Sequence, residues 1–222
     1  MCGRYTLFSD MDTLSARFAF RGKGITFRPN YNVAPTQDVH TVVNDGERRG
    51  ELMKWGLIPS WSKDAKMTFS TINAKAETLA TSRLYAPAYK KRRCLVLASG
   101  FYEWRKDGPN KTPMCIGLKS GQPFAFAGLW DGWKKPDGTW LHSCTIVTTE
   151  PNDVVRPIHN RMPVILTSEA ESLWLDPMTT DPKALDRLLI PFEDEPMIAY
   201  EVSPAVNNVR NNSPDLLKPV AS

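Results

Sequence analysis

Cys94-Leu95-Val96-Leu97-Ala98 is a continuous apolar run that leads through Ser99 into Gly100-Phe101-Tyr102-Glu103-Trp104. A short apolar run that ends near a glycine is typical of a strand buried on both faces. Glu103 then stands between aromatic neighbours, where a carboxylate loses much of its contact with water. This stretch therefore predicts a buried strand with an unusual acid just beyond its end.

Further strand patterns lie on both sides of this run. Residues 40–44 and 51–58 form a predicted hairpin around Asp45-Gly46, a dipeptide that suits a tight turn. Because most connections are short, the strands are expected to pair antiparallel. The remaining strands are predicted at residues 114–118, 124–129, 141–148, 164–166 and 197–202, with Gly121, Asp131-Gly132 and Asp137-Gly138 marking turns.

Helical segments are fewer. A helix is predicted within residues 10–20, because apolar residues there recur at helical spacing behind Ser9 or Asp10 as the cap. The other predicted elements are a helical segment over residues 74–91 broken at Pro87, a helix over 168–175 opened by a capping box of Ser168 and Glu171, a helix over 181–189, and an ordered loop over 28–35.

These elements define the predicted fold class. Strands outnumber helices, no fixed-period repeat occurs, and no Ser/Gly-rich linker divides the 222 residues. We therefore predict an α+β fold in a single domain over residues 1–222. Its mostly antiparallel, curved sheet is expected to close into a barrel-like core with a few peripheral helices.

The composition argues against several classes of protein. No run of about 18 apolar residues is present and no signal peptide follows Met1, so we expect a cytoplasmic protein. The four cysteines form no CxxC pair and the three histidines are scattered, which argues against a zinc site and gives no sign of any cofactor. Cys94, Cys115 and Cys144 are expected to be reduced core residues. No amphipathic dimer seam is visible, and we expect a monomer.

Charge is distributed unevenly along the chain. Residues 1–110 contain 18 Lys and Arg against 10 Asp and Glu, a net charge of +8, whereas residues 111–222 carry a net charge of −4. A one-sided basic surface suits a polyanion such as nucleic acid. The alternative is a solvated surface without a partner.

The first residues offer unusual chemistry. If Met1 is removed, as is usual before a small second residue, Cys2 carries a free α-amine and a thiol on adjacent carbons. The amine of such a 1,2-aminothiol can form an imine with an aldehyde, and the thiol can then close a thiazolidine ring. The ordinary pKa values of the two groups, about 7.7–8.0 and about 8.5, lie near neutrality. The alternative is that Cys2 is a frayed terminal residue.

Three further side chains are candidates for catalysis. Loss of solvation beside aromatic residues would raise the pKa of Glu103 and suit it to acid–base work, although strand alternation also allows it to face solvent. His159 could shuttle a proton near neutral pH or be a hydrogen-bonded structural residue. Asn73 could hold a ligand or cap a helix. Together with Cys2 they make a full set for covalent catalysis if the fold brings them together.

Six motifs then occur along the chain in a specific order: MCGRYT at residues 1–6, YNVAPTQ at 31–37, MKWGLIPSW at 53–61, NAKAET at 73–78, ASGFYEW at 98–104 and HNRMPVIL at 159–166. In these motifs the chain resembles the SOS-response-associated peptidase (SRAP) family, which includes abasic-site-processing proteins that cross-link to single-stranded DNA. The resemblance covers essentially the whole chain and implies the SRAP fold.

The resemblance implies a role for each matching residue. Cys2, after removal of Met1, would be the nucleophile that forms a thiazolidine with the ring-opened sugar of an abasic site. Glu103 would move protons between amine, thiol and sugar oxygen. His159 would assist opening of the sugar ring and reversal of the cross-link. Asn73 would hold the Cys2 amine or a sugar hydroxyl.

The resemblance also implies a DNA-binding surface. Arg4 and Lys75 would face phosphates, and Trp61, Trp104 and Met162 would lie around the DNA channel, where apolar or aromatic faces can stack on bases. Lys75 stands where arginine is common in relatives. Lysine keeps the charge but loses the bidentate fork, so its contact is expected to be weaker or differently placed.

The expected function is that of an abasic-site sensor, which cross-links covalently to abasic sites in single-stranded DNA and shields the lesion during the DNA-damage (SOS) response. Two alternatives stay open. The first is a cysteine peptidase that processes its own N-terminus, as the family's name indicates. The second is a non-covalent binder of modified bases in duplex DNA.

Overall fold

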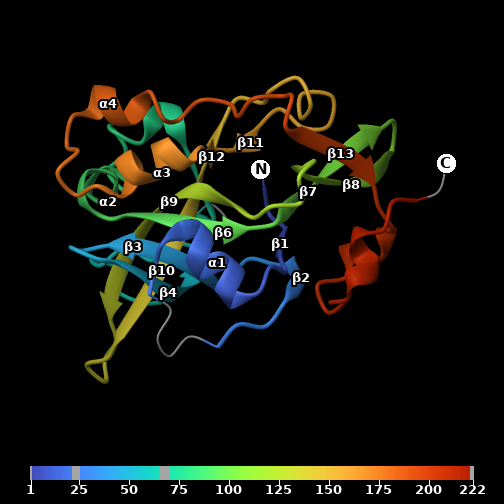
Figure 1. Cartoon of the computed structure of the whole chain (residues 1–222). Coiled ribbons are helices and arrows are strands. Elements are labelled where there is room, and N and C mark those ends of the chain that lie inside the picture. Colours follow the sequence, from blue (N-terminus) through green and yellow to red (C-terminus); the bar gives the residue numbers. More distant parts are fainter. Residues whose placement is uncertain (1, 22–25, 66–70, 221–222) are drawn as a thin grey trace.

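Strand β6 (Arg93–Ala98) is the central element of the structure, a computed structural model that describes residues 2–21, 26–65 and 71–220 (Figure 1). All six residues of this strand are buried. β6 pairs antiparallel with β3 (Asp38–Asn44) on one side and with β9 (Phe124–Lys134) on the other. The apolar run therefore forms the buried strand that the sequence predicts.

The strands around β6 close into a barrel. β3 forms a hairpin with β4 (Arg48–Trp55), β4 pairs in parallel with β10 (Trp140–Thr149), and β10 pairs antiparallel with β9. Since β9 returns to β6, the strands β6, β3, β4, β10 and β9 form a closed ring. The predicted α+β fold with a barrel-like core is confirmed. The short strands β5 (Asn73–Lys75) and β11 (Met162–Pro163) pair with β10, and β12 (Ile165–Leu166) pairs with β9.

A second sheet continues from the barrel. The chain passes from β6 through Ser99 directly into β7 (Gly100–Asp107), which carries Glu103. Tyr5 pairs with Phe101, so the first residues of the chain lie beside this strand. The whole sheet is antiparallel, in the order β13 (Met197–Glu201), β8 (Asn110–Leu118), β7, β1 (Tyr5–Leu7) and β2 (Asn30–Val33).

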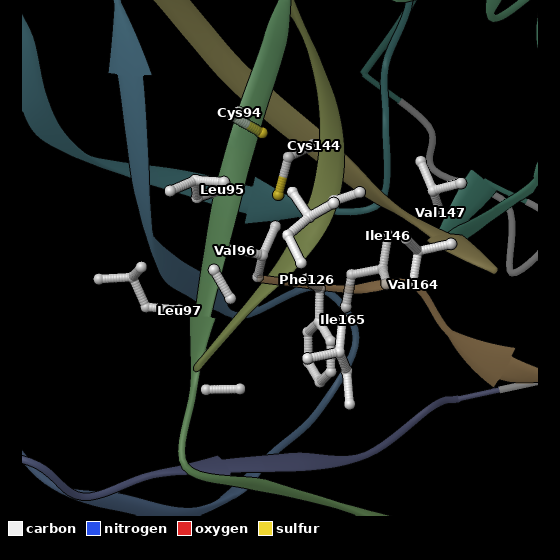
Figure 2. Close-up of a cluster of buried hydrophobic side chains, with 14 of the residues drawn as sticks. Cys94, Leu95, Val96, Leu97, Phe126, Cys144, Ile146, Val147, Val164 and Ile165 are labelled. Carbon is white, nitrogen blue, oxygen red and sulfur yellow. The ribbon is translucent and has the colours of Figure 1, made fainter. Parts of the chain in front are cut away.

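Apolar side chains fill the barrel. Figure 2 shows side chains from its strands, among them Phe126 of β9 and Ile146 of β10, packed together with the thiols of Cys94 and Cys144. Cys94, Cys144 and Cys115 of the second sheet are buried free cysteines, as predicted. The core is therefore built from the continuous apolar runs seen in the sequence.

Helix α1 (Met11–Phe18) lies against one face of the barrel and confirms the helix predicted near the N-terminus (Figure 1). Asp10 is its N-cap, since the Thr13 N–H donates to the carboxylate at 2.8 Å. In its last turn Arg17 donates two hydrogen bonds of 2.9 Å to the buried carboxylate of Glu171. This ion pair joins α1 to a helix far away in the sequence.

That partner, helix α3 (Ser168–Leu175), differs from the prediction at its start. Thr167 is the N-cap, because its hydroxyl accepts a hydrogen bond from the Ala170 N–H. The predicted capping box of Ser168 and Glu171 is therefore wrong. The Glu171 carboxylate is instead engaged by α1, which satisfies it better than an exposed backbone N–H would.

The region between β4 and β6 is less helical than predicted. Its residues form strand β5, the 3₁₀ helix η2 (Ala76–Thr78) and finally α2 (Ala86–Lys91). Pro87 lies in the first turn of α2, where a missing N–H leaves no hydrogen bond unmade. Pro87 therefore helps to open this helix instead of breaking one.

Three other predictions are corrected by pairing or length. Residues 30–33 form the edge strand β2 rather than a loop, because they pair with β1. Asp131-Gly132 lies inside β9 and is no turn, because pairing with β10 continues past it. Helix α4 (Pro182–Asp186) is shorter than predicted, and the 3₁₀ helices η3 (Pro204–Asn207) and η4 (Pro214–Leu217) follow β13. Within the described ranges, no helix has the length and apolar character needed to cross a bilayer.

Gly128 provides a test of the closed barrel, since β9 passes here between β6 and β10. A Cβ atom at this position would lie 2.8 Å from the Cys94 sulfur and 2.9 Å from Cγ2 of Val96. Overpacking of a core typically costs about 1–3 kcal/mol. We expect Gly128→Ala to lower the free energy of unfolding by about this amount in urea denaturation.

Two further variants control this prediction. Cys94→Ala combined with Gly128→Ala removes the closest atom and should return part of the lost stability. Gly117→Ala in β8 is the matched control, because its nearest neighbour would be at an ordinary distance of 3.4 Å. An equal loss of stability in both glycine variants would contradict the packing explanation.

Candidate active site

Cys2 is an ordered residue with 0 % of its surface exposed. The Asn73 side chain donates from Nδ2 to the Cys2 carbonyl at 2.8 Å. Arg4, two residues after Cys2, is held in the same way, because its carbonyl accepts a hydrogen bond of 2.9 Å from the Tyr102 N–H. These hydrogen bonds hold the first residues against β5 and β7, so Cys2 is not frayed.

Asn73 lies at the start of β5, which pairs in parallel with Ile146 of β10. It does not cap a helix, since the residue before η2 is Lys75. Its Nδ2 is used by the Cys2 carbonyl, but its Oδ1 is buried and accepts no hydrogen bond from the described residues. A buried oxygen of this kind is costly to leave unpaired. It is suited to accept from an amine or hydroxyl that arrives beside Cys2.

Glu103 is 3 % exposed in β7 and does not face solvent. Burial raises its pKa from the ordinary value of 4.5 to about 7, and a hydrogen bond from the Trp104 N–H offsets only part of this effect. Burial and the nearby charge of Glu103 both raise the pKa of the Cys2 thiol. The two groups therefore interact, and a carboxyl that titrates near neutrality is suited to exchange protons with its neighbours.

His159 lies in the loop before β11 and is half-buried. Its Nδ1 lies 3.0 Å from the Arg161 N–H and 3.2 Å from the Arg161 carbonyl oxygen, so the backbone of Arg161 holds this side of the ring in either tautomer. Burial lowers the pKa of His159, and the charge of Lys106 adds to this effect. The imidazole is therefore held in one orientation and favoured in its neutral form.

Arg161 connects two of the sequence motifs. Its guanidinium makes a bidentate pair with the Glu77 carboxylate at 2.6 and 2.9 Å and donates to the Thr148 carbonyl at 2.6 Å. This ties the loop of His159 to η2, which directly follows β5 and Asn73. Sequence reasoning missed this role, although both partners lie inside the motifs NAKAET and HNRMPVIL.

One cleft of about 420 Å³ brings part of the site to the surface. Cys2 and Asn73 are buried beside the site and do not line this cleft. Among the described residues, no three His, Cys, Asp or Glu side chains gather where a metal ion could be held. The residues that line the cleft are Glu103, Trp104, Lys106, Lys111, His159 and Asn207.

Arg4 and Trp104 form the wall next to the cleft. Arg4 donates from Nη1 to the Asn32 side chain at 2.8 Å and to the Val206 carbonyl at 2.7 Å. Its guanidinium lies 5.9 Å from the centre of the Trp104 ring. The Trp104 indole N–H in turn donates to Asn207 at 2.8 Å. In this structure, Arg4 fixes the wall of the site through protein contacts.

The other residues predicted to bind DNA differ in whether the structure exposes their side chains. Lys75 is exposed, two residues after Asn73 on β5. Trp61 is 67 % exposed in the loop after β4. Met162 is completely buried in β11 and accepts a hydrogen bond from the Asn152 N–H, so it presents no exposed face to a base.

Asn32 is a second residue that sequence reasoning missed. Its buried side chain donates from Nδ2 to the carbonyls of Val206, Asn208 and Asn211 at 3.3, 3.1 and 2.9 Å. It thereby fixes the segment that carries Asn207, which lines the cleft. The motif YNVAPTQ contains this asparagine, but the distant carbonyls that it binds have no pattern in the sequence.

Comparison with known proteins decides the family. A profile described as SOS response associated peptidase (SRAP) matches residues 1–209. The chain belongs to the SRAP family. Abasic site processing protein YoqW of Bacillus subtilis (strain 168) is 48 % identical over 224 residues, which cover 98 % of this chain and 99 % of that protein.

A more distant relative and a solved structure also match nearly the whole chain. Abasic site processing protein HMCES of Xenopus tropicalis is 33 % identical over 228 residues, which cover 88 % of this chain and 68 % of that protein. A crystal structure of a protein from Bacteroides thetaiotaomicron matches with a TM-score of 0.91 at 26 % identity. The match covers 99 % of this chain and 100 % of that protein. The fold described above is therefore the SRAP fold.

The raised pKa of Glu103 predicts how stability depends on pH. Its ordinary value is 4.5 and its value in the folded protein is about 7, so the folded state holds the proton more tightly. Tighter proton binding by Glu103 stabilises the folded state relative to the unfolded state. This stabilisation is fully present below pH 4.5 and is lost as the pH rises through about 7. We expect Glu103→Gln, which cannot ionise, to be more stable than the parent protein at pH 8 by up to about 3 kcal/mol, at about 1.4 kcal/mol per pKa unit.

Urea denaturation at pH 8 and pH 5 measures this effect. The difference between the two proteins should shrink at the lower pH. Glu201→Gln is the matched control, because this carboxylate is exposed on β13. A Glu103→Gln variant with the same relative stability at both pH values would show that the buried acid does not titrate near neutrality.

Proposed function

We propose that this SRAP-family protein is an abasic-site sensor, which binds covalently to abasic sites in single-stranded DNA through Cys2. The observation that carries the proposal is the placement of Cys2 against Asn73 and Glu103, with His159 on the same cleft as the acid. The names of the relatives support the same substrate, since YoqW and HMCES are abasic site processing proteins.

The proposed reaction begins after removal of Met1. The Cys2 α-amine attacks the aldehyde carbon of the ring-opened sugar, and loss of water leaves an imine. The thiol sulfur then adds to the imine carbon, and the thiol proton passes to the nitrogen. The product is a five-membered thiazolidine, formed without oxidation or reduction, that would shield the lesion from strand scission.

The surrounding residues supply the proton transfers that this sequence needs. Glu103, with a pKa of about 7, can accept the thiol proton when ionised and deliver a proton to the leaving oxygen when neutral. Asn73 Oδ1 would accept a hydrogen bond from the Cys2 amine. His159, which lines the same cleft as Glu103, would exchange a proton with the sugar, assisting ring opening and, in reverse, release of the cross-link.

The DNA strand is proposed to follow the basic N-terminal half. Lys75 would contact a phosphate, and Trp104 and Trp61 would stack on bases. Arg4 supports the wall of the site, and its contact with DNA stays a prediction. Met162 is left out of the proposed DNA surface, because it is completely buried. Binding of this kind weakens with salt, because phosphate contacts release counterions. Action as a cytoplasmic monomer in the SOS response is part of the same proposal.

The direct test is a cross-linking assay with single-stranded DNA that contains one abasic site, analysed on a denaturing gel. We expect a heat-stable adduct with the parent protein. Cys2→Ala keeps the amine but lacks sulfur, so it should form only an imine that borohydride must trap. Cys144→Ala, which removes another buried thiol, is the matched control and should react normally. A heat-stable adduct that persists in Cys2→Ala without borohydride would defeat the proposal.

The rate of cross-linking tests the role of the acid. Proton transfer by a positioned carboxylate typically contributes about 10²–10⁴-fold, so Glu103→Gln should slow adduct formation by a factor in this range. The measurement is the adduct yield over time at saturating protein. Glu201→Gln serves as the control, and an unchanged rate in Glu103→Gln would make Glu103 a structural residue only.

A second candidate function is a cysteine peptidase, favoured by the family's description. It shares the Cys2 nucleophile, so only the substrate separates the two. Cleavage of a peptide that depends on Cys2, together with absence of a DNA adduct, would select this alternative. Intact mass of the purified protein shows in both cases whether Met1 has been removed.

A further inference from the structure

The hairpin of β7 and β8 carries two lysines in an unfavourable arrangement. Lys106 pairs directly with Lys111 across the two strands. Residues that pair directly have their side chains on one face of the sheet, and two like charges placed in this way destabilise the pair. The arrangement therefore calls for a reason outside the hairpin itself.

The other cation of this hairpin is neutralised, whereas these two are not. Arg105 lies on the opposite face of β7 and contacts Asp107 at 3.0 Å and Glu201 at 3.7 Å. In the described part of the chain, neither Lys106 nor Lys111 forms an ion pair with a carboxylate, and both are exposed. One face of the hairpin thus presents two uncompensated ammonium groups.

The two lysines border the candidate active site. Lys106 and Lys111 line the same cleft as Glu103 and His159. Trp104 is two residues before Lys106, so strand alternation places its ring on the same face, about 7 Å along the strand. The charge of Lys106 also reaches the imidazole, since it contributes to the lowered pKa of His159. An aromatic ring followed by cations is the arrangement that binds a single strand by stacking and phosphate contact.

We propose that Lys106 and Lys111 form a binding site for one backbone phosphodiester of the DNA strand, next to the nucleotide that stacks on Trp104. A phosphate between the two ammonium groups offsets their repulsion and lowers the positive charge that Lys106 places beside His159. The inference rests on the proposed function, because it names the part of the DNA that this edge of the cleft holds. It assigns a role to residues that carry no part of the covalent chemistry.

Binding without cross-linking tests this site. The probe is a single-stranded oligonucleotide with a tetrahydrofuran abasic analogue, which has no aldehyde and forms no imine. Lys106→Gln combined with Lys111→Gln should weaken binding at least about tenfold, as expected for lost charge-assisted contacts. The slope of log affinity against log salt should become shallower by about 0.7, the value for one phosphate of a single strand.

Lys134→Gln combined with Lys135→Gln is the matched control. It removes the same charge from the hairpin between β9 and β10, at the far end of the barrel (Figure 1). We expect this pair to change neither the affinity nor the salt slope appreciably. Equal losses in the two double variants would overturn the site and indicate a general effect of net charge.

The contacted phosphate can be located by replacing single phosphates with uncharged methylphosphonates. One position should weaken binding to the parent protein but have no further effect on the Lys106→Gln/Lys111→Gln variant. If every replacement weakens binding to both proteins alike, the site does not exist. Failure of the parent protein to cross-link true abasic DNA would instead reject the proposed function. If the parent protein cross-links normally but the Lys106→Gln/Lys111→Gln variant keeps an unchanged salt slope, only this inference is rejected.

Discussion

The hydrogen bond from Asn73 to the Cys2 carbonyl is the contact on which the site depends. Asn73 belongs to the barrel, because β5 pairs with β10, whereas Cys2 belongs to the segment that enters the second sheet through β1. The bond therefore joins the two sheets at the point where chemistry is proposed. It also explains how the start of a chain, which is usually loose, becomes a buried residue with a defined neighbour.

Burial has opposite effects on the two ionisable groups beside this contact. It raises the pKa of Glu103 and lowers that of His159, so both groups tend toward their neutral forms near neutral pH. Glu103, whose pKa is about 7, can therefore both accept and give a proton near neutral pH. The fixed positive charges lie outside this neutral centre, on Lys106 and Lys111 at the edge of the cleft. A neutral reacting centre with a charged rim suits a substrate whose reactive carbon is uncharged and whose neighbouring groups are anionic.

Much of the fold follows from local patterns in the sequence, and the site follows only in part. The apolar run at residues 94–98 predicts β6, and the pair Ser9 and Asp10 predicts the cap of α1 to within one residue, because burial and capping leave signals within a few residues. Residues 30–33 form a strand only because β1 lies beside them, and Glu171 is held by Arg17 from another helix; such partners lie far away in the sequence. The site residues Cys2, Asn73, Glu103 and His159 could be named from chemistry and resemblance. Their support by Arg161 and Asn32 could not, since it consists of contacts to distant carbonyl and carboxylate groups.

The segment after β13 builds a wall of the site from the other end of the sequence. Val206 and Asn207 bond to Arg4 and Trp104, and Asn32 holds the carbonyls around them. During biosynthesis the residues around Cys2 leave the ribosome long before the residues of this wall do. We infer that a growing chain carries its reactive thiol long before the surrounding cleft exists, and that the finished cleft forms only when the segment around residue 207 has emerged. The proposed covalent capture of a lesion is thereby reserved for molecules in which both parts of the cleft have been synthesised.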